Sequence, residues 1–335
     1  MRSLRFGLMA AVFAAVLLTT GRPAQSALPD HGTFSIVAID MTNGDIGIAI
    51  SSRVLAVGAE TAFAETGIGG VVTQAAANVT FGPKGLALLR VGRGAKEVLG
   101  ELLDADEGRE NRQAAIVDAK GNVAQFTGKE CLNWCGGVTG KTYAAQGNIL
   151  TGEAVVKEMG RAFEAATGQL ADKLIAALEA GQAAGGDSRG KQSAHILVVR
   201  KNAGYGGRSD RYIDLRVDDH PEPVAELHRI LNISLSFQAM IAGANLRVRD
   251  KKVDDSIKFD LDALKKYPGS AFLLYDLACG YAVKGDKDQA FDYLGQTIKI
   301  RPDAKTWARG DTEFSDEFKA DPRWKDLVGA APAPK

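Results

Sequence analysis

The sequence contains few of the residues on which many catalytic and metal sites depend. Among its 335 residues there are only four histidines and three cysteines. They form neither paired CxxC units nor an HExxH motif, which are typical of zinc sites. Scarce histidine also disfavours a Ser-His-Asp triad, because the nearest pair, Ser193 and His195, lies in one predicted strand and is no established catalytic arrangement. We therefore expect neither a metal ion nor a cofactor.

An excess of charge of either sign is also missing. Lys and Arg number 41, and Asp and Glu also number 41, so no overall field attracts nucleic acid or an anionic membrane. A nucleic-acid partner is therefore not expected. Hydrophobic residues make up 45% and charged residues 24% of the chain, which are the proportions of a folded globular protein. The length predicts two domains.

The N-terminal apolar run is shorter than a membrane span, which needs about 20 residues. It occupies residues 6–18, follows two arginines and precedes small residues before position 27. This layout is typical of a secretory signal peptide. We predict a signal peptide at residues 1–26, a short pro-segment at 27–32, export to the periplasm or the medium, and no membrane span after signal cleavage. A retained anchor is the less favoured alternative.

Cysteine usage is compatible with export but does not require it. Cys131 and Cys135 lie four residues apart and can form a small disulfide in an oxidising compartment. The sequence does not decide whether they pair. Cys279 lies in an apolar helical pattern and is predicted to be a buried thiol.

Hairpins and paired helices alternate from residue 33 onward. Apolar runs on either side of Asn43-Gly44 predict a hairpin, since both turn residues tolerate positive φ. The order along the chain is strands, two helices, strands, two helices, strands, and the strands are apolar on both faces. We predict an α+β domain at residues 33–220, a four-layer αββα sandwich in which helices cover two antiparallel sheets.

The pattern changes to helix alone after a predicted linker at Asp219–Pro223. Residues 271–303 fit the tetratricopeptide repeat at its characteristic spacings, an earlier degenerate copy is expected at 236–269, and a last helix near Trp324 is expected to cap the stack. We predict a tetratricopeptide-repeat-like helical domain at residues 221–330. Because stacked helical hairpins present a groove suited to peptides, this domain is expected to bind a protein partner or a second copy.

Thr33 offers a catalytic route that needs no histidine. If the bond between Gly32 and Thr33 is cut, the freed α-amine, with a pKa of about 8, can take the proton from the threonine's own hydroxyl. Such an enzyme needs its nucleophile at the start of a buried strand, a small preceding residue and nearby oxyanion donors. Gly32 and the apolar run from Phe34 meet the first two needs. The alternative is that Thr33 is simply a good strand residue after a loop glycine.

Several stretches together resemble the bacterial domain-of-unknown-function family 1028: "TFSIVAIDMTNGDIGIAISSRVLAVGA", "VVTQAAANVTFGPKGLALL", "AAQGNIL", "AGGDSRGKQSA" and "DLRVDDHPEPVAELHRIL". The resemblance covers about residues 33–231. The family is placed with the N-terminal-nucleophile (Ntn) hydrolases, so the resemblance implies their αββα fold and a Thr33 nucleophile, but no substrate. Similarity to the amidase branch of that superfamily implies that a hydroxyl at Ser51 assists the nucleophile.

Uncharged amides stand at the ends of two predicted strands, namely Gln74 and Asn78 after one and Gln146 and Asn148 in another. We predict that Gln74 or Asn78 donates to an oxyanion and that Gln146 and Asn148 bind substrate. Hydrogen bonding of these amides to loop backbone is the alternative.

The glycine-rich loop "GGDSRGKQS" carries further candidates for substrate binding, namely Asp187, Arg189 and Gln192. Arg189 can hold a carboxylate in a bidentate fork, or it can pair with Asp187 and fix the loop. The combined hypothesis is an exported Ntn-type amidohydrolase acting on a small amide or peptide-like substrate. The alternative is a catalytically silent binding or scaffold protein that acts through its helical repeats. It draws support from the residues preceding Thr33 and from the lack of the acidic residue and lysine found in proteasome-like relatives.

Overall fold

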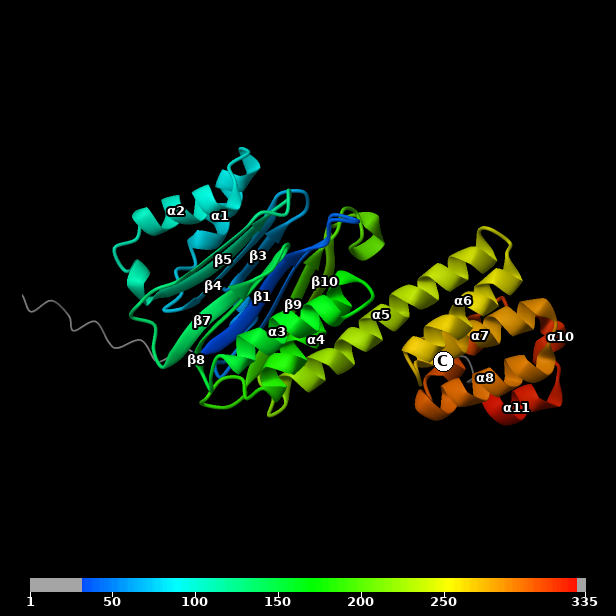
Figure 1. Ribbon diagram of the computed structural model, residues 1–335. Coiled ribbons are helices and arrows are strands. Elements are labelled where there is room, and N and C mark those ends of the chain that lie inside the picture. The colour runs from blue at the N-terminus through cyan, green and yellow to red at the C-terminus, as the bar shows by residue number, and fades with distance from the viewer. Residues whose placement is uncertain (1–31, 330–335) are drawn as a thin grey trace, which may run out of the picture.

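The structure is a computed structural model that describes residues 32–329 (Figure 1). The predicted signal peptide at 1–26 and nearly all of the predicted pro-segment at 27–32 lie outside these residues. The described part is a mixed α+β fold with two antiparallel sheets, followed by a helical region. No helix in residues 32–329 is long and apolar enough to cross a membrane.

The larger sheet has six strands in the order β10-β9-β2-β1-β8-β7, and every neighbouring pair is antiparallel. Its strands are β1 (Thr33–Ile39), β2 (Ile46–Ser52), β7 (Trp134–Thr139), β8 (Tyr143–Leu150), β9 (Ser193–Val199) and β10 (Arg211–Val217). The smaller sheet has four antiparallel strands, β3 (Ala62–Glu65), β4 (Gly69–Ala75), β5 (Arg112–Asp118) and β6 (Val123–Thr127), in sequence order.

The two sheets face each other, and a pair of helices covers the outer face of each (Figure 1). Helices α3 (Ala154–Ala165) and α4 (Leu170–Ala183) pack on the larger sheet, and α1 (Phe81–Arg90) and α2 (Ala95–Asp104) pack on the smaller one. Side chains alternate along each strand, so Val37 in β1 joins the core between the sheets while Phe34 joins the core under α3 and α4. This double burial explains why β1 is apolar on both faces.

The predicted hairpin at Asn43-Gly44 is confirmed, since β1 and β2 pair antiparallel with Ile39 opposite Ile46. Its turn is longer than a two-residue loop, and only Gly44 has positive φ, at 78°. Asn43 instead accepts a hydrogen bond from the backbone N–H of Asp45 at 2.9 Å. The turn residues act as expected of Asn and Gly, but through different geometry.

The helical region comprises α5 (Pro223–Val248), α6 (Val253–Lys266), α7 (Ala271–Lys284), α8 (Lys287–Ile300), α9 (Ala304–Gly310), α10 (Asp316–Lys319) and α11 (Pro322–Val328). The Ser270 side chain caps the start of α7, and Gly285, with φ of 88°, ends it before Asp286 caps α8. These three residues produce the helical hairpin expected from the spacing.

Helix α5 connects the sheets to the other helices (Figure 1). Its first part packs on β9, β10 and α4, and it also packs on α6 and α7. Leu227 and Leu231 of α5 belong to the same apolar cluster as Tyr267 and Leu273 of the helical region. The predicted linker at 219–223 therefore leads directly into a helix that both parts of the chain share.

Candidate active site between the sheets

Thr33 lies at the start of β1, in the middle of the larger sheet, and its side chain is on the face toward the smaller sheet. Its side chain shares that face with Val37, because residues two apart in a strand point the same way. Thr33 is buried, with 2% of its surface exposed. The predicted nucleophile therefore begins a buried strand and faces the space between the two sheets.

A chain of two hydroxyls joins Thr33 to the carbonyl before it. Ser52 is opposite Thr33 in the β1–β2 register, and the distance from Thr33 Oγ1 to Ser52 Oγ is 3.0 Å. Ser52 Oγ also donates a short hydrogen bond to the carbonyl oxygen of Gly32. Since a serine has one hydroxyl proton, Thr33 must donate to Ser52. The protons therefore point from the Thr33 hydroxyl through Ser52 to the Gly32 carbonyl.

Arg189 supplies a second donor to the same carbonyl, with Nη2 at 2.8 Å from Gly32 O. A bidentate pair with Asp187 fixes the guanidinium, with Nε to Oδ1 at 3.1 Å and Nη2 to Oδ2 at 2.7 Å. Asp187 has 1% of its side chain exposed and also accepts from the backbone N–H of Arg53 at 3.1 Å. Two donors, the buried hydroxyl of Ser52 and the guanidinium of Arg189 that is fixed by its ion pair with Asp187, therefore converge on the carbonyl oxygen of Gly32.

Ser52 and Arg189, and not the predicted oxyanion donors Gln74 and Asn78, are the side chains that donate to the Gly32 carbonyl. Gln74 Nε2 donates instead to the carbonyl of Thr33 itself, at 3.2 Å. Gln192 accepts from Arg53 Nη1 at 2.7 Å and is at the outer side of the loop.

The space between the sheets beside Thr33 holds a network of buried amides. Gln74 accepts from Ser35 Oγ at 2.6 Å and donates to Gln113 Oε1 at 2.7 Å. Asn148 donates to the same oxygen of Gln113 at 3.1 Å. Gln113 joins the two sheets, and it is not among the predicted site residues. Its position opposite Gln74 in the β4–β5 pairing is the signal that locates it.

Gln146 is the exception in this network. It is fully buried and opposite Ser35 in the β1–β8 register. Neither its amide nitrogen nor its amide oxygen has a hydrogen-bond partner among residues 32–329. The structure thus brings Gln146 to the predicted site without giving its amide a protein partner.

The structure does not bring Ser51, the residue expected to assist the nucleophile, to the side chain of Thr33. Ser51 is opposite Phe34, so its side chain lies on the face of the sheet away from Thr33. Its hydroxyl donates to the backbone carbonyl of Ser193 at 3.1 Å. Because neighbouring strand residues point to opposite faces, a shift of one position exchanges Ser51 for Ser52.

The structure does not bring Asn78 into the Thr33 network. Asn78 donates to Asp106 Oδ2 at 2.9 Å and accepts from the backbone N–H of Thr80 at 3.2 Å. It lines a separate cavity of about 280 Å³ between α1 and α2, together with Phe81 and Lys84. The chain leaves β4 at Ala75, which has φ of 64°, and this turn takes Asn78 away from the strand end.

Two other serine arrangements are structural. Residues 186–190 read Gly-Asp-Ser-Arg-Gly, the letters of a nucleophile elbow, but they follow a helix and Ser188 donates to the carbonyl of Ile149 at 2.9 Å. Ser193 donates to the carbonyl of Val54 at 2.6 Å rather than to His195. His195 instead contacts Asp214 at 2.9 Å, and this hydrogen bond holds the pKa of Asp214 below its usual value.

Comparison with known protein families shows to which family the chain belongs. Residues 33–227 match the family described as "Family of unknown function (DUF1028)". The chain belongs to the DUF1028 family.

A solved structure supports the DUF1028 assignment. The chain is similar to the crystal structure of a DUF1028-family protein from Silicibacter pomeroyi, with 33% sequence identity and a TM-score of 0.55. The similarity covers 60% of this chain and 84% of that protein. No match was found among curated proteins. The family description names no reaction.

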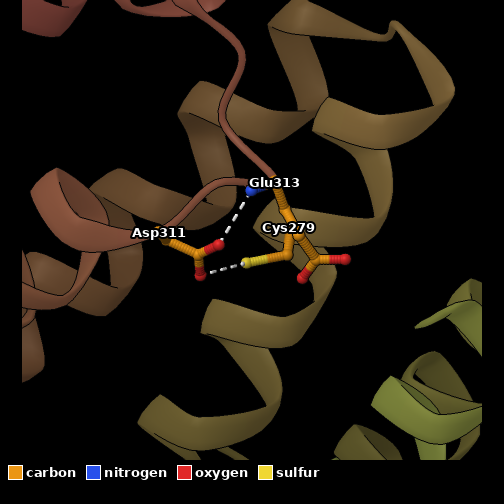
Figure 2. A group of neighbouring side chains, drawn as sticks. All are labelled: Cys279, Asp311 and Glu313. Carbon is orange, nitrogen blue, oxygen red and sulfur yellow. Dashed lines mark hydrogen bonds between the residues drawn. The ribbon is translucent and has the colours of Figure 1, made fainter.

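A second polar cluster lies outside the part that matches DUF1028. Figure 2 shows Cys279 of α7 beside Asp311 and Glu313. One possible metal-ligand atom of each residue lies within 4.8 Å of those of the other two. Cys279 donates to Asp311 at 3.6 Å, and both carboxylate oxygens of Glu313 accept from Arg247, at 2.7 and 2.8 Å. Burial raises the pKa of Cys279, which disfavours the thiolate that a metal needs. We interpret the cluster as a network that joins α5, α7 and the loop after α9.

Cys131 and Cys135 are both free thiols in this structure. Cys135 Sγ donates to the carbonyl of Cys131 at 3.4 Å. Burial, together with Cys135, raises the pKa of Cys131 to about 11. Their pairing under oxidising conditions stays a prediction.

Proposed function

We propose that this protein is an exported Ntn-type amidohydrolase that makes its own nucleophile by cutting the bond between Gly32 and Thr33. The observation that carries the proposal is the directed chain from Thr33 Oγ1 through Ser52 Oγ to the carbonyl of Gly32. The signal-like sequence at residues 1–26 supports export, and membership of DUF1028 supports an Ntn-like sandwich at residues 33–220. A small amide or peptide-like molecule is the proposed substrate.

Self-cleavage begins with attack by Thr33 Oγ1 on the carbonyl carbon of Gly32. The threonine proton passes to Ser52 Oγ as Ser52 gives its own proton to the carbonyl oxygen, so the tetrahedral intermediate forms without net charge. Arg189 donates to the same oxygen and stabilises the partial negative charge that this oxygen carries in the transition state, before the proton transfer is complete. The hydroxyls of two residues therefore serve as a proton relay where histidine is absent.

Collapse of the intermediate breaks the bond from the Gly32 carbonyl carbon to the Thr33 nitrogen. The proton on the former carbonyl oxygen returns through Ser52 to that nitrogen. The products are an ester between Gly32 and Thr33 Oγ1 and a free amine on Thr33. Water then hydrolyses the ester, releases the leader as a carboxylate and leaves a chain that starts with Thr33.

The mature site uses the same atoms on a substrate. The free α-amine of Thr33, with an ordinary pKa of about 8, takes the proton from its own hydroxyl as Oγ1 attacks a substrate amide. Ser52 and Arg189 are the proposed oxyanion donors. Gln74 positions the start of β1 through its bond to the Thr33 carbonyl. The proposed substrate contacts are Asn148, which is opposite Thr33, and Gln146, whose amide has no hydrogen-bond partner among residues 32–329.

The intact mass of the purified exported protein tests the proposal. We expect the wild-type chain to begin at Thr33 and the Thr33→Ala variant to keep the residues before position 33. Hydrolysis of a panel of amides is expected from wild type and not from Thr33→Ala. A chain that begins at Ala27 and stays uncut in every preparation would contradict the proposal.

A second candidate is a silent sandwich that carries a binding domain. We propose a tetratricopeptide-repeat-like character for residues 221–330 on the basis of the α7–α8 hairpin and its caps. A cavity of about 640 Å³ lies in this region and is lined by the aromatic residues Phe237, Phe272, Tyr275 and Trp307. This cavity is the feature that favours binding of a protein partner or a second copy. An uncut chain without amidase activity would favour this candidate.

A further inference from the structure

The α-carbon of Gly32 lies directly against the carboxylate of Asp187. A Cβ atom added at Gly32 would come within 2.7 Å of Asp187 Oδ2 and 2.8 Å of Oδ1. Real Cβ atoms essentially never approach oxygen this closely. Any L-residue with a side chain would therefore require Asp187 to move, and only glycine fits here without such a movement.

Asp187 has little freedom to move away. Its carboxylate accepts from the side chain and backbone of Arg189 and from the backbone N–H of Arg53. Its backbone forms an isolated β-bridge with Leu150, at the end of β8. A side chain held from this many directions acts as a fixed wall.

Self-cleavage and substrate hydrolysis share one intermediate if the proposed function holds. The ester that joins Gly32 to Thr33 Oγ1 during self-cleavage is chemically an acyl-enzyme. An acyl group taken from a substrate would be held by the same oxygen of Thr33 and by the same donors, Ser52 and Arg189. Its α-carbon would then face the Asp187 wall, as the α-carbon of Gly32 does.

We propose that the enzyme selects amides whose acyl group is glycyl or N-acylglycyl, and that Asp187 determines this specificity. The inference rests on the proposed function and adds the substrate class to it. The reaction cleaves the bond between the glycyl carbonyl carbon and the leaving nitrogen, and water supplies the hydroxyl of the acid and the proton of the amine. Acyl groups with an L side chain are excluded because their Cβ meets Asp187.

Two matched substrates test the selection in the mature chain that begins at Thr33. N-acetylglycyl 4-nitroanilide and N-acetyl-L-alanyl 4-nitroanilide differ by one methyl group, and the corresponding 4-nitrophenyl esters report the nucleophile with a better leaving group. We expect kcat/KM to favour the glycyl compound by at least about tenfold in each pair, since overpacking by one methyl group commonly costs that much. Thr33→Ala is expected to abolish hydrolysis of all four.

Two variants of Asp187 test the wall itself, and each is produced as the mature chain behind an initiator Met. Asp187→Asn keeps the size of the side chain and is expected to keep the glycyl preference. Asp187→Ala removes both oxygens and is expected to bring the ratio of glycyl to alanyl rates close to one, even where both rates fall because Arg189 is released. The ratio in the wild-type enzyme tests the proposal even where a variant fails to fold.

The outcomes separate the specificity from the function. Thr33-dependent hydrolysis of glycyl and L-alanyl compounds at equal rates would overturn the specificity and leave the amidohydrolase intact. An unchanged ratio in folded Asp187→Ala would overturn the role of Asp187. Absence of Thr33-dependent hydrolysis of every anilide and ester would overturn both.

Discussion

Ser52 has a single hydroxyl proton, and it donates this proton to the Gly32 carbonyl, which can only accept a hydrogen bond. The Thr33 hydroxyl must then donate to Ser52. Ser52 donates no hydrogen bond to Thr33 Oγ1, so the lone pairs of this oxygen are available for nucleophilic attack. This direction distinguishes a reactive pair from a simple cross-strand contact between two strand hydroxyls.

Ser52→Ala is the variant that tests the relay. It removes the proton path and one of the two donors to the Gly32 carbonyl, and loss of one such donor commonly slows catalysis by about 10²–10³-fold. We expect processing before Thr33, followed by intact mass over time, to slow by at least that factor. Ser51→Ala is the matched control, because its hydroxyl faces away and bonds to Ser193, and it is expected to process normally. Equal slowing in both variants would contradict a relay through Ser52.

Thr33 and Ser52 differ in how well the local sequence predicts them. The adjacent glycine, threonine and apolar run predict Thr33 as the start of a buried strand. Which of Ser51 and Ser52 is opposite Thr33 depends on the hairpin register, and the turn sets that register with six residues between Ile39 and Ile46. Gln113 was missed because it becomes a site residue only when β5 pairs with β4. Cross-strand partners are long-range facts that local patterns do not contain.

The contact of helices α5, α6 and α7 contains a buried pair of acidic side chains. Asp260 of α6 and Asp276 of α7 lie beside Arg247 of α5, and Asp260 is fully buried. Arg247 forms ion pairs with Asp276 at 2.6 Å and with Glu313 at 2.7 Å. Together with Asp260, three carboxyl groups therefore lie beside a single guanidinium cation. The spacing of apolar residues predicted these helices, but it gave no sign that their contact holds an uncompensated acid.

This acid pair predicts a pH dependence of stability. Burial, and then the nearby charge of Asp276, raises the pKa of Asp260 well above its usual range. The folded state therefore keeps a proton that the unfolded chain releases above pH of about 4. The free energy of unfolding should fall as pH rises from there toward the raised pKa, by at most about 1.4 kcal/mol per pH unit from this group.

Asp260→Asn is expected to remove that dependence, because the amide is neutral at every pH. Urea unfolding at pH 5 and pH 8 should show a smaller loss of stability in the variant than in wild type, and a higher stability of the variant at pH 8. Asp262→Asn on the same helix is the control, since Asp262 is exposed and its pKa is lowered by Lys265 and Lys258. A variant that loses as much stability as wild type between the two pH values would show that Asp260 is not protonated in the fold.

Helix α5 packs against both the larger sheet and the other helices, so one element contributes to the cores of both parts of the chain. The sequence predicted the change of composition after residue 219, and it also predicted helices beyond it. It did not predict that a single helix would bury side chains on both sides of that boundary. The apolar pattern of α5 does not say which neighbour each turn will meet, so this sharing emerges only in three dimensions.

Leu231→Ala tests whether the two parts unfold together. Leu231 of α5 has 1% of its surface exposed and lies in the cluster that includes sheet residues and Leu273 of α7. Loss of its side chain should lower the free energy of unfolding by about 2–5 kcal/mol. Because the cluster is continuous, calorimetry should show one unfolding transition in wild type, and the variant should shift all of this transition to lower temperature.

Ile233→Ala is the control. Ile233 lies on the exposed side of the same helix, with 45% of its surface exposed, and its replacement should change the free energy of unfolding by no more than about 0.5 kcal/mol. Two separate transitions, of which Leu231→Ala shifts only one, would mean that α5 joins the parts without coupling their folding.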